Sequence, residues 1–199
     1  MSTTAPEGQR TSGSSLTLTD ALLEVLKFVN DWLQFAEKKN GVLIAADLAV
    51  AMALLRAMWS MRAEEPVVAV ALAFSALLFL LAALASFASF LPRLKLPWLF
   101  TRDQAPQEDF NVVFFGHAAQ FSPEDYLSKL SKSIGCATAP SPFERQLAEQ
   151  VVMNSRIAEW KYRWFSWAAW ITICAVLTPI VGLPLWWAWN RRIAMKEAD

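Results

Sequence analysis

The chain has 199 residues, of which 55% are hydrophobic and 18% are charged. Eighteen Lys and Arg balance eighteen Asp and Glu, so no net basic charge points to a nucleic acid as a partner. The two cysteines offer neither zinc spacing nor a disulfide framework. This composition favours a mainly α protein: a multi-span helical membrane protein with a small, mostly helical cytosolic section.

The start of the chain predicts a disordered end and then an amphipathic helix. Residues 1–19 are rich in Ser and Thr, which predicts disorder and does not resemble a signal peptide. Thr19 or Asp20 can cap a cytosolic helix over residues 20–40. Four apolar residues of this helix recur on one face: Leu22, Leu26, Val29 and Leu33. We interpret this face as a packing surface.

Residues 41–91 predict a transmembrane hairpin of two spans. The first candidate span, Gly41–Met61, carries Asp47 and Arg56, whose spacing places them on opposite faces of a helix. We expect Asp47 to lie near the cytosolic interface or to face another helix, and Arg56 to extend to the far interface. The second, Pro66–Leu91, has no charge and is long enough to cross a bilayer.

Small residues recur four apart in the second span, at Ala69/Ala73, Ala82/Ser86 and Ala85/Ser89. This spacing permits close approach of helices and favours a homo-oligomer. An Ala-rich segment also produces such spacing by chance.

Residues 92–163 predict a cytosolic sensing section. The run F-N-V-V-F-F-G-H predicts a short extended, β-like segment that ends at Gly116 and His117. Ser122 and Pro123 then open a short helix to about Ser133, which Gly135 stops.

The section ends in a long helix that enters the membrane. Ser141, Pro142 and Glu144 form a capping box, and no Gly or Pro follows from 143 to 178. A helix of that length measures roughly 54 Å, which exceeds the ~30 Å hydrocarbon core. Its first part would therefore stand in water and its second part in lipid.

Residues 164–189 predict the third span, with a tail over 190–199. Tryptophans mark both of its ends: Trp164, Trp167 and Trp170, then Trp186, Trp187 and Trp189. Trp167 and Trp186 are separated by roughly 28 Å of helix, close to the hydrocarbon thickness, as expected for two aromatic belts. We expect Pro179, Gly182 and Pro184 to kink the distal half.

The distribution of basic residues predicts the orientation. With three spans, the N-terminus and residues 92–163 share one side, which carries thirteen Lys and Arg against four on the other. The positive-inside rule then places that side in the cytosol. The basic tail opposes this orientation. Two spans would follow if Gly41–Met61 stayed outside the membrane.

The cytosolic section lacks the signature of an enzyme. His117 is the chain's single histidine, and no paired-His metal motif, nucleophile elbow or Walker motif is present. His117 can be structural, or it can meet a ligand beside Gly116. Four basic residues lie on the long helix near the membrane: Arg145, Arg156, Lys161 and Arg163. They can extend toward the interface, or they can bind an anionic phosphate.

These residues resemble a known family. The order is an amphipathic helix, an apolar hairpin beginning A-A-D at Ala45–Asp47, and F-F-G-H at Phe114–His117. S-P-E-D-Y at Ser122–Tyr126 and F-E-R-Q-L-A-E-Q-V…R-I-A-E-W-K-Y-R at Phe143–Arg163 precede the final span. The chain resembles the transmembrane effectors of bacterial Pycsar antiphage systems. It has Leu48 and Ala49 where that pattern often has a Lys-Ala pair near the Asp.

The resemblance implies a receiver of a cyclic pyrimidine nucleotide, cUMP or cCMP, made by a partner cyclase after infection. Activation would impair the inner membrane and arrest or kill the infected cell. The nucleotide would lie among Gly116, His117, Tyr126, Arg156 and Lys161. Asp47, Arg56, Trp164, Trp167 and Trp186 would act in the membrane. The resemblance implies no enzymatic activity, cofactor or metal.

Two other classes of function stay open. A constitutive membrane scaffold or sensor would bind a protein partner through the apolar faces Leu22–Leu33 and Met153–Trp160. A membrane enzyme would use His117 with Asp or Glu as a hydrolase.

Overall fold

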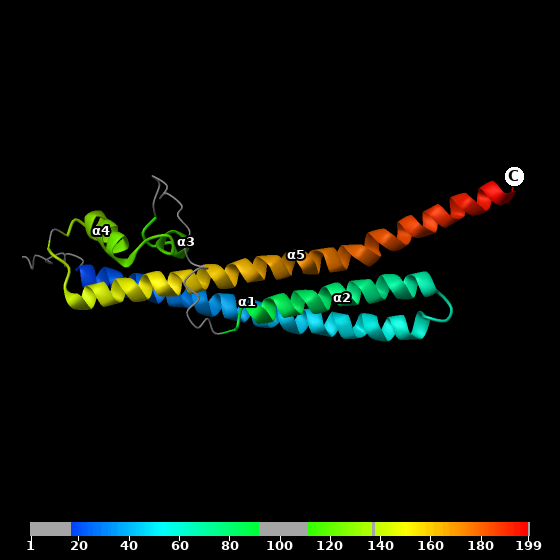
Figure 1. Cartoon of the computed structure of the whole chain (residues 1–199), viewed down its shortest axis with the longest axis horizontal. Coiled ribbons are helices and arrows are strands. Elements are labelled where there is room, and N and C mark those ends of the chain that lie inside the picture. Colours follow the sequence, from blue (N-terminus) through cyan, green and yellow to red (C-terminus); the bar gives the residue numbers. More distant parts are fainter. Residues whose placement is uncertain (1–16, 92–110, 137, 199) are drawn as a thin grey trace, which may run out of the picture.

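The computed structural model describes residues 17–91, 111–136 and 138–198. This part of the chain contains helices and no strand. The helices are α1 (Leu18–Met61), α2 (Pro66–Ala88), α3 (Phe115–Ala118), α4 (Pro123–Ser133) and α5 (Pro142–Ala198). Figure 1 shows α1, α2 and α5 as an elongated bundle, with α3 and α4 beside one end of α5. The mainly α fold class is confirmed.

Helix α1 is continuous from the predicted amphipathic helix into the predicted first span. It begins at Leu18, where Thr17 rather than Thr19 or Asp20 provides the cap by accepting a hydrogen bond from the Asp20 amide at 3.1 Å. Gly41 does not interrupt it, because one glycine costs a helix only ~1 kcal/mol relative to alanine. The 44 residues measure roughly 66 Å, twice the hydrocarbon thickness. Of the predicted disordered segment, residues 1–19, the first 16 residues lie outside the part of the chain that the structure describes.

Helix α5 is the second long element. The predicted capping box is present: the Ser141 amide donates to Glu144 Oε2 at 2.7 Å, and the Glu144 amide donates to Ser141 Oγ at 3.3 Å. The helix continues through Pro179 and Pro184, so the third span and the tail form one helix. Figure 1 shows its distal part turning away from α2, where the prolines predicted a kink.

Helices α1 and α5 run parallel in a fixed register. Four side-chain hydrogen bonds join them, between Thr19 and Glu144, Asn30 and Asn154, Glu37 and Lys161, and Asp47 and Thr172. The partners are always 124 or 125 residues apart. Because this offset is constant, the two helices pair in one register along their shared length. If α5 shifts along α1 at one end of the bundle, it must shift by the same amount at the other end.

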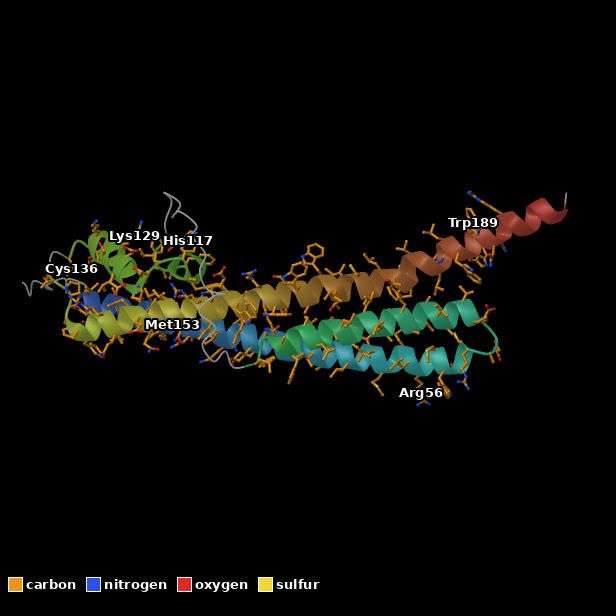
Figure 2. All side chains as sticks on the ribbon, in the orientation of Figure 1. Arg56, His117, Lys129, Cys136, Met153 and Trp189 are labelled. Carbon is orange, nitrogen blue, oxygen red and sulfur yellow. The ribbon has the colours of Figure 1, made fainter. Side chains whose placement is uncertain are left out.

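The end of the bundle that holds the N-terminal half of α1 and the first half of α5 has its own hydrophobic core. Leu22 and Val29 of α1 are fully buried there against Val151 and Val152 of α5. The predicted apolar face of α1 is thus a packing surface inside this chain. The face Leu22–Leu33 is therefore not free to bind a protein partner, as the scaffold alternative requires. On the second proposed docking face, Met153–Trp160, Met153 is exposed (Figure 2).

Three helices are long and apolar enough to cross a membrane: α1, α2 and α5. Helix α2 returns antiparallel beside α1 after a short turn and also packs on α5. Ala82 and Ser86, one of the predicted small-residue pairs, are fully buried. This close packing occurs within the chain, and a homo-oligomer stays a prediction.

The run before His117 is not extended as predicted. Phe114 has extended backbone angles, but Phe115–Ala118 form the helical turn α3. Phe115 and Ala118 are buried, three residues apart on one face, and the Phe115 ring stacks on Tyr162 at 5.3 Å. Packing on α5 thus overrides the β propensity of the run. Helix α4 has its predicted Ser122 cap and its stop at Gly135, whose φ is +70°.

Candidate functional site

Residues 111–136, with α3 and α4, form a small unit on the first half of α5 that we call the cap. Its packing joins the core of α1 and α5 through Phe115, Phe121, Tyr126 and Leu130, all of them buried. Figure 2 shows His117 and Lys129 on the outer side of this unit. The cap therefore shares one hydrophobic core with α1 and α5.

Arg156 fastens the cap to α5. Its Nε donates to the Ala119 carbonyl at 3.1 Å, and its Nη2 donates to the Phe121 carbonyl at 2.9 Å. Both carbonyls belong to buried residues that follow α3. The predicted ligand residue Arg156 thus has an internal role that its sequence position did not reveal, and its nucleotide role stays a prediction.

Tyr126 is the largest fully buried side chain. Its hydroxyl donates to the Val112 carbonyl at 3.0 Å, which ties the start of the cap to α4. Burial raises the pKa of the Tyr126 phenol far above its usual value, so the ring stays neutral. A ligand could reach this predicted site residue only after the cap opened.

Gly116 and His117 lie together on α3. The Asn111 amide donates to His117 Nδ1 at 3.1 Å, and the His117 ring meets Phe114 edge-on at 5.3 Å. A Cβ added to Gly116 would lie 2.6 Å from Phe114 Cε1. Glycine at this position therefore allows the Phe114 ring to fold over α3.

Lys161 joins α5 to α1. Its Nζ lies 2.5 Å from Glu37 Oε1, and 5.5 Å from the ring centre of Phe90. It is mostly buried, with 12% of its side chain exposed. The five predicted ligand residues therefore do not lie in one place. Gly116 and His117 lie on α3, and Tyr126 lies in the core of the cap. Arg156 contacts the backbone of the cap, and Lys161 contacts α1.

Two cavities lie between the cap and α5. One, of about 580 Å³, is lined by α4 and the first turns of α5, including Glu124, Arg145 and Glu149. The other, of about 320 Å³, is lined by Phe114, Phe115, Gly116, Glu159, Tyr162, Arg163, Ser166 and Trp167. We call it the α3 cavity. Gly116 and the basic residue Arg163 both line it, and the predicted ligand-binding set stays a prediction.

The spacing of Arg145, Arg156, Lys161 and Arg163 in the sequence did not indicate which structural neighbour each of them would have. All four lie on one helix, and only the positions of α1 and the cap decide whether each one faces a cavity, the cap backbone or α1. No group of three or more metal-binding side chains occurs among the described residues.

The membrane part contains a buried carboxylate. Asp47 is 1% exposed, and the Thr172 hydroxyl lies 3.0 Å from its Oδ1 and 3.3 Å from its Oδ2. Arg56 is exposed and points away from the bundle in Figure 2, so the predicted opposite faces are confirmed. Trp164 packs on Trp160, and Trp167 is 65% exposed. Roles for these residues and for Trp186 at the bilayer interfaces stay predictions.

Comparison with known proteins identifies the family. Residues 21–188 match the family described as the PycTM Pycsar effector protein domain. A relative named Pycsar effector protein PtPycTM, from Propioniciclava tarda, is 29% identical over 154 residues. That match covers 76% of this chain and 71% of the relative. No solved structure matches. Since the family domain covers most of its length, the chain belongs to the Pycsar effector family and is an antiphage defence effector.

Proposed function

We propose that this effector responds to a cyclic pyrimidine nucleotide, cUMP or cCMP, and then impairs the bacterial inner membrane. A partner cyclase makes the nucleotide after infection, and the loss of membrane integrity arrests or kills the infected cell. The proposal rests on one structural observation above the others. Helices α1 and α5 continue without a break from the cap into the spans, in a fixed parallel register.

The α3 cavity offers chemistry that suits a cyclic nucleotide. Arg163 can pair with the phosphate, and the Glu159 carboxylate can accept a hydrogen bond from the ribose hydroxyl. The aromatic rings of Phe114 and Tyr162 can flank the pyrimidine. The predicted residues Gly116 and His117 lie beside this cavity on α3.

Binding would change the contact of α5 with α1. A ligand shifts an equilibrium only when it binds one arrangement better than the other. Three of the four cavity residues named above, Glu159, Tyr162 and Arg163, belong to α5 itself. Lys161, between them, pairs with Glu37 of α1. A nucleotide in the α3 cavity therefore acts on the helix segment that holds α1, and α5 carries the change into the bilayer.

A release assay tests the proposal. The purified full-length chain is placed in liposomes loaded with a small fluorescent dye that is a monovalent cation, and cUMP, cCMP or cAMP is added. We expect release with a pyrimidine nucleotide and not with cAMP. No release with either pyrimidine nucleotide at any dose would contradict the proposal.

Two matched variants locate the nucleotide. Arg163→Met removes the cation of the α3 cavity, and Arg145→Met removes the cation of the larger cavity. A charge-assisted hydrogen bond contributes about 1.5–3 kcal/mol, so we expect Arg163→Met to raise the half-maximal nucleotide dose roughly 10- to 100-fold. Arg145→Met should leave it unchanged. The reverse pattern would move the nucleotide to the larger cavity.

A further inference from the structure

Five polar side chains of the three apolar helices form what we call the inner seam. They are Asn40 and Asp47 of α1, Ser75 and Ser86 of α2, and Thr172 of α5. Asn40, Ser75 and Ser86 are fully buried and Asp47 is 1% exposed. Polar groups are rare at such positions, because burial in an apolar environment costs free energy unless each group finds a partner.

Only part of the inner seam is satisfied by hydrogen bonds. The Thr172 hydroxyl contacts Asp47, and Ser75 Oγ donates to the Ala175 carbonyl at 2.6 Å. Both amide atoms of Asn40 and the hydroxyl of Ser86 have no hydrogen-bond partner. Each unsatisfied group costs about 1–3 kcal/mol. Apolar side chains at these two positions would therefore make the closed bundle more stable.

The two unsatisfied groups lie at the same depth. Asn40 precedes Met61, the end of α1, by 21 residues, and Ser86 follows Pro66, the start of α2, by 20 residues. In an antiparallel hairpin these positions lie at the same level. Two helices thus each bury an unsatisfied polar group at one level of the closed bundle, which points to a second state in which water reaches them.

The inner seam extends through much of the membrane. By the same count, Ser75 lies at the depth of residue 52 of α1. Residues 40 to 52 cover roughly 18 Å of helix, more than half of the ~30 Å hydrocarbon core. Asp47 lies between these limits and is the one residue of the seam that can carry a charge. Arg56 lies on the opposite, outer face of α1 (Figure 2).

We propose that the inner seam lines a hydrated path for monovalent cations when α5 moves away from α1 and α2. Asp47 attracts cations and repels anions, and the neutral oxygens of Asn40, Ser75 and Ser86 replace part of the ion's hydration shell. A single carboxylate suits monovalent ions, because divalent sites use more charged oxygen ligands. Opening requires α5 to move, since Thr172 covers Asp47. This inference rests on the proposed function and specifies how the membrane is impaired.

Ion selectivity in planar bilayers tests the inner seam. The full-length chain is activated with cUMP or cCMP under a KCl gradient, and the permeability ratio of K⁺ to Cl⁻ is measured. We expect a ratio well above one for the natural chain, and at least a fivefold lower ratio for Asp47→Asn. The matched control, Asp31→Asn, makes the same change on the exposed cytosolic half of α1 and should leave the ratio unchanged.

Water access to Ser75 provides a second test that does not depend on the Asp47 variant. In a chain with Cys136→Ser and Cys174→Ser, the variant Ser75→Cys is treated with a charged thiol reagent. We expect labelling at least tenfold faster with the activating nucleotide than without it. A Ser75→Cys chain that releases dye but is not labelled would overturn the inference.

The possible results separate the two proposals. Nucleotide-dependent currents with the same K⁺/Cl⁻ ratio in Asp47→Asn would overturn the inner seam and leave the proposed function standing. A natural chain that gives neither current nor dye release with either nucleotide would contradict the proposed function, and the inner seam with it.

Discussion

Arg156 is expected to hold the cap on α5, and replacing it with Met should loosen the cap. The guanidinium makes two charge-assisted hydrogen bonds, to the Ala119 carbonyl at 3.1 Å and the Phe121 carbonyl at 2.9 Å. Each contributes about 1.5–3 kcal/mol, and Arg156→Met leaves both carbonyls of these buried residues without a donor. The free energy of local opening should fall by at least ~3 kcal/mol, which corresponds to roughly 100-fold faster opening.

Hydrogen exchange of the full-length chain in detergent measures this opening. Peptides from residues 111–136 should exchange roughly 100-fold faster in Arg156→Met, while peptides from the membrane half of α5 should not change. Arg156→Lys, which keeps the charge but not the planar pair of donors, should give an intermediate rate. Arg145→Met, on the same helix, is the matched control and should exchange normally.

A different result would assign Arg156 to the ligand. If Arg156→Met leaves cap exchange within about threefold of the natural chain but abolishes nucleotide-dependent release, the two backbone hydrogen bonds do not anchor the cap. Arg156 would then bind the nucleotide directly, as predicted from the sequence.

Three further predictions concern the cap and the start of α5. The backbone hydrogen bond from Ser141 lowers the pKa of Glu144 below its usual value, so the stabilising effect of the carboxylate is present above the usual pKa and is lost as the pH falls through the lowered pKa. Hydrogen exchange of the first turn of α5 should therefore accelerate at acid pH, and Glu144→Gln should remove this pH dependence. Gly116→Ala places a Cβ 2.6 Å from the Phe114 ring, so thermal unfolding should show a midpoint several degrees lower, and an unchanged midpoint would mean that the ring moves freely. Tyr126→Phe loses one buried donor and should destabilise the cap by about 1 kcal/mol in denaturant unfolding, whereas a loss above 3 kcal/mol would reveal another role for the hydroxyl.

Most elements that depend on local interactions were predictable from the sequence, although the N-cap of α1 is Thr17 and not Thr19 or Asp20. Two helix N-caps occur where predicted, at Ser122 and Ser141, and α4 ends at Gly135 as predicted. Each of these features involves only neighbouring residues. The opposite faces of Asp47 and Arg56 follow from helix geometry alone. The two capping motifs and the helix face therefore required no knowledge of the tertiary structure.

The elements that depend on distant contacts were not predictable. Phe115 is helical because it packs on α5, and Arg156 faces the cap because α1 occupies the other side of α5. The register of α1 on α5 joins residues more than 120 positions apart, and no short motif encodes it. The sequence therefore did not indicate that Arg163 lines a cavity, that Arg156 contacts the cap and that Lys161 pairs with Glu37.

The most direct test of the mechanism is to lock α1 to α5 and measure dye release. Asn154 Nδ2 donates to Asn30 Oδ1 at 2.9 Å, so cysteines at these two positions are close enough for a short thiol-reactive cross-linker. In a chain with Cys136→Ser and Cys174→Ser, a cleavable cross-linker joins Asn30→Cys to Asn154→Cys before cUMP or cCMP is added. We expect the locked protein to release no dye and to regain full release after the linker is cleaved. Equal release before and after cleavage would contradict a mechanism in which α5 moves against α1.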